Sequence, residues 1–568
     1  MIYLVNFADK YHKIIVVFFF ATFLILGVFA ARDYGIGGDE FRNRLYGNII
    51  YDYVASPSLS DSYLHHISEF NNQSLGGWAA NEEAFHPTRG WFSLTHGPVF
   101  EVLLVFLERR LGLDDVHQFF VLRHIACFIF FLIGSIFFFI ITKKIFGKWH
   151  IGLLGSLGLF MSPFIFGYSF VSSMDISFMV AVIISITTML YLIEKPTLIR
   201  TIIHSISCAI MMDIRIAGLF IPFLTFCILT IDMLLGRFRG ASRKILCYGV
   251  VYIFSVTLLV IIMWPALWDA PVKSFFQALY LSSKEASRFP WAELYLGKPT
   301  YSNELPWHFI PVWIGITTPV HYVFLFAIGI INGCWSLRRP LNFYKERKQE
   351  LILYFCFLIP ILTVILFNTS QTEGWRQLLF VYPPFLIIAI RGLISLFAGV
   401  KKLMPSPIHK YAAFGTAIVF ALLMARLANV MVTLHPYELF YYNSLVGGLS
   451  GVQNRFEMHW DDEYKQGLSA ILKMESRSCF KVYARRLKFS RMIFGPDERA
   501  RINMVNSAEE ADYVVTNCWD NRPSYAEKYK KIWSRHFDGV DILAVYKTGD
   551  VPSIGVSKVS NAPNDIGF

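Results

Sequence analysis

The feature that most constrains this chain is a series of long apolar runs, which recurs from the N-terminus to about Thr433. Each run has about 17 to 25 residues, the length of helix that crosses about 30 Å of hydrocarbon. The composition agrees, because 55% of the 568 residues are hydrophobic and the mean hydropathy is +0.47. The sequence therefore predicts a polytopic α-helical membrane protein with about eleven spans, at 14–31, 121–142, 151–170, 176–193, 201–214, 216–235, 245–266, 310–333, 351–367, 377–399 and 411–433.

The charged residues between the runs indicate the side of the membrane on which each loop lies. Short cytoplasmic loops carry an excess of Lys and Arg, and alternate loops of this chain are basic. Their basic residues are Lys10, Lys13, Lys143, Lys144, Lys148, Lys195, Arg200, Arg237, Arg239, Arg243, Lys244, Arg338, Arg339, Lys345, Arg347, Lys348, Lys401, Lys402 and Lys410. We expect a cytoplasmic N-terminus, with segments 32–120 and 267–309 outside. The net charge of +11 largely reflects this bias and needs no nucleic-acid partner.

The short segment 99–111 decides this topology. It holds Glu101, Glu108, Arg109 and Arg110 around a small apolar face, which suits a helix on the membrane surface better than a span. If this segment were counted as a span, every later loop would be placed on the opposite side of the membrane. The run at 14–31 is expected to remain as an anchor, because no small-residue cleavage site precedes the polar residues that follow it.

The composition changes after Thr433, which predicts a membrane domain, 1–433, and a polar domain, 434–568. Segment 460–474 has the pattern of an amphipathic helix, and CFKVYARR, ADYVVTNCW and DILAVYK have the pattern of strands. We expect a small α/β domain on the outer side of the membrane. Of the eight cysteines only Cys479 and Cys518 lie there, and they could form a disulfide or stay as two thiols.

Polar residues gather in the outer loops, beginning with a pair of carboxylates after the first span. In GIGGDEF three glycines precede Asp39 and Glu40, so a tight turn can direct the carboxylates at the membrane surface. A solvated acidic turn would have the same sequence. The chain contains no Walker or GxGxxG loop and no Cys/His cluster with metal-ligand spacing. An ATP-driven pump and a structural zinc site are therefore disfavoured.

Later segments supply further candidates. HPTRGWFSLTHGP contains Arg89 and His96, which could contact a lipid phosphate or belong to a loop that only caps a helix. Asp175 in SMDISF either faces a cavity or caps the next helix. Arg215 in MMDIRIAG lies between apolar runs and needs an anionic partner, either Asp213 or a bound phosphate. The cations of the last two outer loops are Lys298, His308 and Arg376.

The order of these motifs resembles a known family. From about residue 30 to residue 450 the chain contains GGDE, HGP, SMDISF, MMDIRIAG, WPALWDAP, LPWHFIPVWIGITTP, TEGWRQLLFVYPP and LHPYELFYYNSLVGG. In this order they resemble bacterial membrane glycosyltransferases of the GT-C fold. The similar branch is that of the protein O-mannosyltransferases and the lipid A aminoarabinose transferase, as in glycosyltransferase family 39.

The resemblance implies an enzyme that transfers a sugar from a polyprenyl-phosphate donor to an acceptor on the outer face of a bacterial inner membrane. Asp39 is then similar to a general base that takes the proton of the acceptor hydroxyl, with inversion at the anomeric carbon. Glu40 would orient Asp39 or the acceptor. The leaving phosphate needs cations, and the candidates are Arg376 first and Arg215 second, followed by Arg89, Lys298 and His308.

Two departures from the family bear on the substrate. The chain has no long repeat-bearing insertion, which argues against a protein acceptor, and it has HGP where the aminoarabinose transferase pattern has a lysine-proline pair. The expected partners are therefore the lipid-linked donor, membrane lipids and a lipid or glycan acceptor such as lipopolysaccharide. No cofactor is assigned, because a carboxylate pair can bind a divalent metal but two ligands are too few to claim one.

Two other functions stay open. The chain could be a carrier that moves a lipid-linked saccharide across the bilayer, or an inactive relative whose outer domain serves in assembly. A carrier often has paired repeats with polar groups near the bilayer centre. The polar candidates of this chain gather at one face instead, which favours the enzyme.

Overall fold

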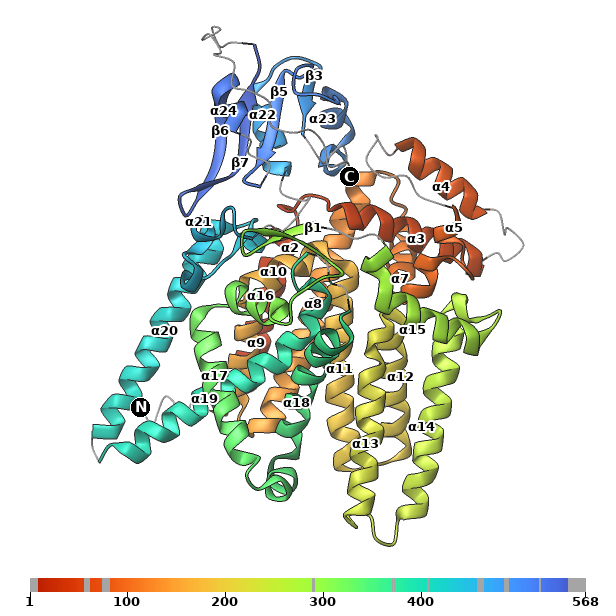
Figure 1. The fold of residues 1–568 in the computed structure, drawn as a ribbon, viewed down its shortest axis with the longest axis vertical. Helices are drawn as coiled ribbons and strands as arrows, with labels where there is room; N and C mark the ends of the chain where they lie inside the picture. The colour runs from red at the N-terminus through yellow and green to blue at the C-terminus, as the bar shows by residue number, and fades with distance from the viewer. Residues whose placement is uncertain are drawn as a thin grey trace.

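The computed structural model describes residues 9–55, 62–73, 82–288, 292–369, 371, 373–405, 408–456, 464–484, 490–519 and 523–549. Long helices form a bundle, and an α/β region lies at the upper end of it (Figure 1). The bundle consists of α2 (His12–Ala30), α8 (Val116–Phe146), α9 (Trp149–Phe160), α10 (Pro163–Val171), α11 (Ser173–Glu194), α12 (Leu198–Ile214), α13 (Phe220–Leu234), α14 (Ser242–Met263), α17 (Val320–Ser336), α18 (Pro340–Phe367), α19 (Tyr382–Leu403) and α20 (Ile408–Leu434).

Shorter elements come from the predicted outer loops and from the turns that begin or end bundle helices. They are α3 (Gly38–Ala55), α4 (Ser62–Gln73), α5 (Glu82–Phe85), α6 (Trp91–Thr95), α7 (Val99–Arg110), η1 (Ile216–Leu219), η2 (Pro265–Leu267), α15 (Pro271–Arg288), β1 (Ala292–Tyr295), β2 (Lys298–Tyr301), α16 (Phe309–Thr317) and η3 (Arg376–Val381).

Eight helical segments of the described chain are long and apolar enough to span a membrane, or nine if α9 and α10 together form one span. The chain is a multi-pass membrane protein, with fewer uninterrupted spans than the eleven predicted. The run 151–170 is divided between α9 and α10, which are bent by 69°, and 310–333 is divided between α16 and α17. Pro163 and Pro319 lie at these breaks, because proline starts a helix more readily than it continues one. The run 201–214 lies in α12, which has 17 residues.

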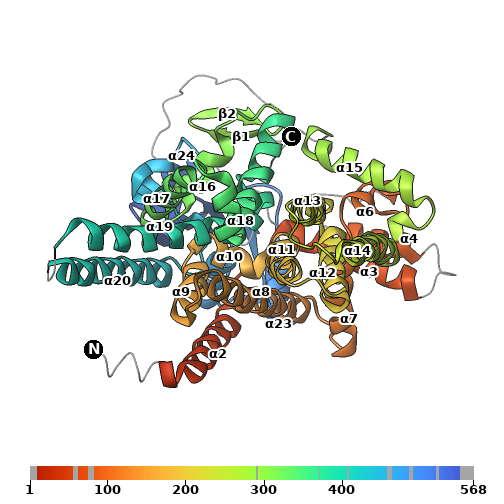
Figure 2. The same ribbon diagram turned by 90° about the horizontal axis from the view of Figure 1, so that it is seen from below.

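α11 lies inside the bundle, whereas α2 and α20 lie at its edge. A helix that is apolar on all sides is expected to be buried, and most side chains of α11 are buried from Ser173 to Ile193. Few side chains of α2 and α20 are buried, and Figure 2 shows both helices at the periphery. Their exposed apolar side chains suit contact with lipid.

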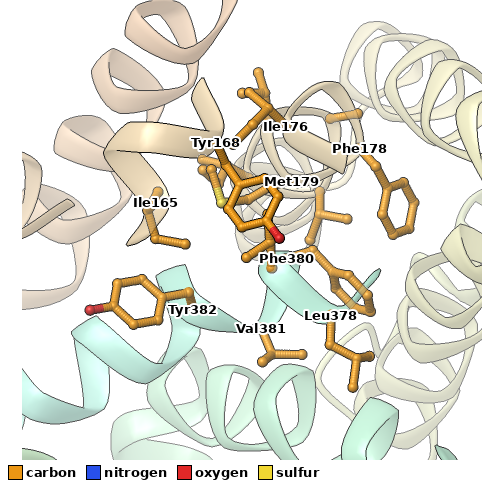
Figure 3. Packing of buried hydrophobic residues seen from close by; sticks show 14 of the residues in the cluster. Ile165, Tyr168, Ile176, Phe178, Met179, Leu378, Phe380, Val381 and Tyr382 are labelled. Atoms are coloured by element: carbon orange, nitrogen blue, oxygen red, sulfur yellow. The ribbon is translucent and has the colours of Figure 1, made fainter. Parts of the chain in front are cut away.

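The first turns of α11 pack against η3. Figure 3 shows Phe178 and Met179 of α11 close to Phe380 and Val381 of η3. The rings of Phe178 and Phe380 are 4.9 Å apart in an edge-to-face arrangement. This packing places the beginning of η3 next to the beginning of α11.

The C-terminal region contains a five-stranded mixed sheet in the order β4-β3-β5-β7-β6. β3 pairs in parallel with β4 and β5, and β7 pairs antiparallel with β5 and β6. Leu468 and Ile471 of α22 share a buried cluster with Val515 and Leu543 of the sheet. The polytopic helical fold with a small C-terminal α/β region is confirmed. The elements after α20 are η4 (Glu438–Phe440), η5 (Ser444–Val446), α21 (Gly448–Val452), α22 (Lys465–Met474), β3 (Phe480–Tyr483), η6 (Ser490–Ile493), α23 (Pro496–Arg501), β4 (Ile502–Met504), β5 (Tyr513–Asn517), α24 (Pro523–Lys528), β6 (Lys530–Phe537) and β7 (Val540–Lys547).

The disulfide considered from the sequence is wrong, because Cys479 and Cys518 are both free. Cys479 precedes β3 and Cys518 follows β5, and these two strands are parallel neighbours. The two thiols therefore lie at opposite ends of the sheet. The five residues of β5 extend about 16 Å, whereas the Cα atoms of a disulfide lie within about 7 Å of each other.

α7 is too short to span a membrane, as predicted, but it is not simply a surface helix. Its carboxylates Glu101 and Glu108 are buried and accept from Arg123 of α8, at 2.7 and 2.6 Å. Glu108 also pairs with Arg44 of α3 at 3.0 Å. These ion pairs connect α7 to both α3 and α8, which explains the charged residues of segment 99–111.

Removing Arg123 should destabilise the protein. Glu101 would stay buried without its counter-charge, and Glu108 would keep only the ion pair with Arg44. We expect Arg123→Met to cost about 3–5 kcal/mol, which lowers the Tm in detergent by roughly 5–15 °C. Arg110→Met is the matched control, since Arg110 is exposed at the end of α7. Equal melting of the two variants would show that the network contributes little.

Candidate functional site

α3 begins at Gly38 and carries two carboxylates in its first turn. Acidic residues are favourable there because the helix N-terminus carries a partial positive charge. Consecutive helical residues point about 100° apart, so Asp39 and Glu40 have different surroundings. The side chain of Asp39 is 37% exposed, whereas Glu40 is 4% exposed.

Both carboxylate oxygens of Glu40 have partners that hold the start of α3 in place. One carboxylate oxygen accepts from the N–H of Gly37 at 2.9 Å, and the other lies 3.0 Å from Nε2 of His124 on α8. Glu40 thus caps the start of α3 and ties it to the bundle. This placement does not support the predicted role, in which Glu40 orients Asp39 or the acceptor.

Arg376 is the predicted cation that the structure places against Asp39. Its Nη2 lies 2.7 Å from Oδ2 of Asp39, and its Nη1 lies 2.7 Å from Oε2 of Glu373. Nε of Arg376 is 3.9 Å from Oδ2 of Asp175. Arg376 stands at the start of η3, which packs on α11 as Figure 3 shows. It therefore lies between two carboxylates that come from separate sequence motifs.

Asp175 and Arg215 form the next ion pair, with Oδ1 of Asp175 2.5 Å from Nη2 of Arg215. Ser172 donates its hydroxyl to Oδ2 of Asp175 at 2.8 Å. Ser172 is itself the N-cap residue of α11, so the alternative that Asp175 is the N-cap is wrong. Asp213, the other partner considered for Arg215, accepts from the N–H of Val99 at 2.8 Å.

Arg42 and His96 complete the cluster. Arg42 lies one helical turn after Asp39, and its Nη2 is 2.7 Å from Oδ1 of Asp39. The guanidinium of Arg42 also lies over the ring of Phe92. The ring of His96 stacks on Phe92 with centroids 4.4 Å apart. Burial lowers the pKa of His96 to about 3, and the charges of Arg215 and Arg42 act in the same direction. The imidazole is therefore neutral at physiological pH.

Each arginine of this cluster keeps an unused donor. Nε of Arg42, Arg215 and Arg376 is buried, and none of these three atoms has a hydrogen-bond partner among the described residues. A buried donor without an acceptor is costly. Three such donors gather around Asp39 and Asp175, an arrangement that suits the binding of an anion.

The electrostatics of Asp39 are set by its two guanidinium neighbours. Burial disfavours the charged carboxylate, but Arg42 and Arg376 outweigh it and hold the pKa of Asp39 well below its ordinary value. Asp39 is thus ionised throughout the physiological pH range.

Three of the residues predicted to bind phosphate have no contact with this cluster among the contacts between described residues. Lys298 is exposed on β2. His308 places Nδ1 2.6 Å from the hydroxyl of Tyr295. Arg89 is exposed in the turn before α6, where its charge acts on His86. Of the five cations predicted, the cluster contains Arg376 and Arg215.

Two residues of the site escaped the sequence analysis. Arg42 could have been found, because a cation three residues after Asp39 on a helix can return to pair with it. Glu293 of β1 accepts from the backbone N–H groups of Glu373 and Gly374, which have φ values of 55° and 70°. It holds the turn that leads to Arg376, and no local pattern connects these two distant segments.

The carboxylates of the site are already paired with cations of the protein. Within the described ranges, no group of three or more His, Cys, Asp or Glu side chains could hold a metal ion. Asp39 and Asp175 are separated by the guanidinium of Arg376. The divalent metal considered from the sequence stays a prediction.

Comparison with known proteins gives matches to solved structures. No protein-family model matches the chain, and no curated protein sequence matches it. ArnT from Cupriavidus metallidurans bound to undecaprenyl phosphate has a TM-score of 0.44 and 14% identity, over 96% of this chain and 99% of that chain. The archaeal oligosaccharyltransferase AglB from Archaeoglobus fulgidus, in complex with an inhibitory peptide and a dolichol-phosphate, has a TM-score of 0.46 and 11% identity, over 96% of this chain and 75% of that chain. Both are glycosyltransferases of the GT-C fold, but at these low values the likeness carries no part of the functional argument.

The unused arginine donors predict that the cluster binds an oxyanion. A short-chain alkyl phosphate should raise the Tm of the purified protein, because a ligand of the folded state stabilises it. Arg376→Met should weaken this binding by at least about tenfold, the loss expected for one charge-assisted hydrogen bond. Arg89→Met should leave it unchanged, since Arg89 is exposed outside the cluster. Equal binding by the two variants would place the anion elsewhere.

Proposed function

We propose that this chain is a membrane glycosyltransferase that moves a sugar from a polyprenyl-phosphate donor to a lipid or glycan acceptor of the cell envelope. One observation carries the proposal: an accessible carboxylate, Asp39, pairs with Arg42 and Arg376, and Arg215 pairs with Asp175 on the other side of Arg376. Each of these three arginines keeps a buried donor without a partner among the described residues. Transfer from a phosphate leaving group needs a base for the acceptor and cations for the phosphate. The cluster contains both.

In the proposed reaction the acceptor oxygen attacks the anomeric carbon while the bond from that carbon to the phosphate oxygen breaks. Attack opposite the leaving group inverts the anomeric configuration. The proton of the acceptor hydroxyl passes to Asp39, and the electron pair of the broken bond stays on the phosphate. Arg376, Arg215 and Arg42 meet the growing charge, and one such positioned donor is worth on the order of 3 kcal/mol in the transition state.

The low pKa of Asp39 bears on its role as a base. With Arg42 and Arg376 both paired to it, the free carboxylate is ionised but weakly basic. A bound phosphate would compete for the same guanidinium groups and so weaken their hold on Asp39. The pKa of Asp39 should then rise, because one cation shared between two anions stabilises each of them less. Donor binding would in this way activate the base.

The position of the cluster in the bundle supports a proposal for the side of the membrane on which the reaction takes place. The cluster lies at the end of the bundle that carries α3, α7 and the C-terminal sheet, and the basic turns between α13 and α14 and between α17 and α18 lie at the other end (Figure 1). By the positive-inside rule the cluster would face away from the cytoplasm of a bacterial inner membrane. Nucleotide sugars are absent there, which favours a lipid-linked donor. The proposal uses no metal, and a chelator tests that directly.

The central test is Asp39→Asn, which keeps the size of the side chain and removes its basicity. Membranes containing wild-type protein should transfer label from polyprenyl-phosphate hexoses or pentoses to envelope lipids or glycans, measured after lipid extraction. The variant should be slower by about 10²–10⁴-fold, with donor binding retained. Asp114→Asn is the control, because Asp114 is exposed between α7 and α8.

Two outcomes would contradict the proposal. Undiminished transfer by Asp39→Asn would exclude Asp39 as the base. Movement of the donor across the membrane without cleavage, in wild type and variant alike, would favour the carrier that the sequence left open.

The acid limb of the pH profile offers a second test. In the wild type, kcat/KM should not fall through titration of Asp39 until the pH is below about 3.9, the ordinary carboxylate value, because Arg42 and Arg376 lower the pKa. Arg42→Gln removes one of these charges, so the pKa of Asp39 rises and the acid limb moves to higher pH. An unchanged limb in Arg42→Gln, with activity otherwise measurable, would show that Asp39 does not control it.

A further inference from the structure

The C-terminal domain is bonded to the segment that leads into α3. Lys465 of α22 donates from Nζ to the backbone carbonyls of Arg32 and Tyr34, the latter at 3.2 Å. The neighbouring Gln466 donates from Nε2 to the carbonyl of Asp33 at 2.7 Å. Three consecutive carbonyls of a segment without helix or strand are thus held by two adjacent side chains of one helix.

Apolar packing connects the same parts on both sides of Asp39. Ile36 is fully buried in the cluster that contains Leu468 and Ile471 of α22, and Phe41 packs against that cluster. The ring of Phe41 lies 4.6 Å from the ring of Phe120 on α8. Residues three before and two after Asp39 therefore belong to the core of the C-terminal domain.

Ion pairs hold the other side of the contact. His435, which follows α20, places Nε2 3.0 Å from Asp33 and Nδ1 2.7 Å from Glu438. The hydroxyl of Tyr34 donates to Glu438 at 2.7 Å. Arg32 to Tyr34 are in this way fixed between α22 and the end of α20, so the segment has little freedom to move.

We infer that the C-terminal domain is part of the catalytic unit, and that Lys465 and Gln466 are positioning residues for Asp39. Among the described residues, Lys465 and Gln466 make the hydrogen bonds by which α22 holds the carbonyls of Arg32 to Tyr34, and without them this segment would be held less firmly. The first turn of α3 would then vary relative to Arg376, which comes from a different element. A carboxylate that acts as a base has to be held within about 0.5 Å of its productive position, which a free loop does not provide.

The effect on α3 is independent of the reaction, whereas the effect on turnover rests on the proposed function. Hydrogen–deuterium exchange of the full chain in nanodiscs therefore comes first. In Lys465→Met, amides of residues 35–46 should exchange about tenfold faster than in the wild type, the loss expected for a hydrogen bond from a charged donor. Gln466→Met should act in the same direction with a smaller effect.

The controls separate positioning from general loosening. Lys473→Met changes an exposed lysine of the same helix and should leave residues 35–46 unchanged. Lys465→Arg keeps the charged donor and should restore protection. Unchanged exchange of residues 35–46 in both Lys465→Met and Gln466→Met would overturn the inference.

Turnover supplies the second measurement. If the transferase proposal holds, Lys465→Met should lower kcat several-fold with the donor KM little changed, and Lys465→Arg should recover it. Faster exchange together with an unchanged kcat would overturn the positioning role. If the wild type shows no transfer at all, the proposed function fails, while the exchange experiment still decides whether the domain holds α3.

Discussion

The ion pair between Arg376 and Asp39 is the contact on which the arrangement of the site depends. It joins α3, from the segment between α2 and α8, to η3, which precedes a late bundle helix. The same guanidinium pairs with Glu373 and approaches Asp175 of α11. A buried guanidinium stays charged but loses much of its hydration, so its burial is strongly unfavourable unless anions surround it. The position of Arg376 therefore constrains where three otherwise separate segments can lie.

The same rule applies to the other buried charges at this end of the bundle. The bundle helices offer mainly apolar surfaces, which pack closely but do little to orient an irregular loop. Arg123 with Glu101 and Glu108, and His124 with Glu40, hold the segment between α2 and α8 at defined points. Buried ion pairs of this kind contribute less to net stability than to the choice of one arrangement, because a mispaired charge is strongly unfavourable. They explain why so many charged residues lie inside this end of an apolar protein.

The site differs from these structural pairs in one respect. Glu40 and Glu101 have their oxygens occupied by partners within the protein, and among the described residues a single buried donor of Arg123 lacks a partner. Around Asp39 and Asp175 such donors gather instead, one each from Arg42, Arg215 and Arg376. Asp39 is also the accessible member of the acidic pair. An excess of directed donors beside an accessible carboxylate is the arrangement that a phosphate-bearing substrate would complete. The contacts of α22 with Arg32 to Tyr34 extend this framework to the residues that carry Asp39.

The sequence by itself determined the class of structure. The length of the apolar runs required membrane-spanning helices, the change of composition after Thr433 indicated the α/β region, and the motifs contained Asp39, Asp175, Arg215 and Arg376. These features are local, because helix length and strand alternation depend on neighbouring residues. Tertiary structure decided which candidates meet. It turned Glu40 toward His124, placed Lys298, His308 and Arg89 outside the cluster, separated Cys479 from Cys518 across a parallel sheet, and brought in Glu293. The reason is physical: Asp39 and Arg376 lie far apart in the sequence, and the packing of α11 against η3 and of α22 against the start of α3 sets the distance between them.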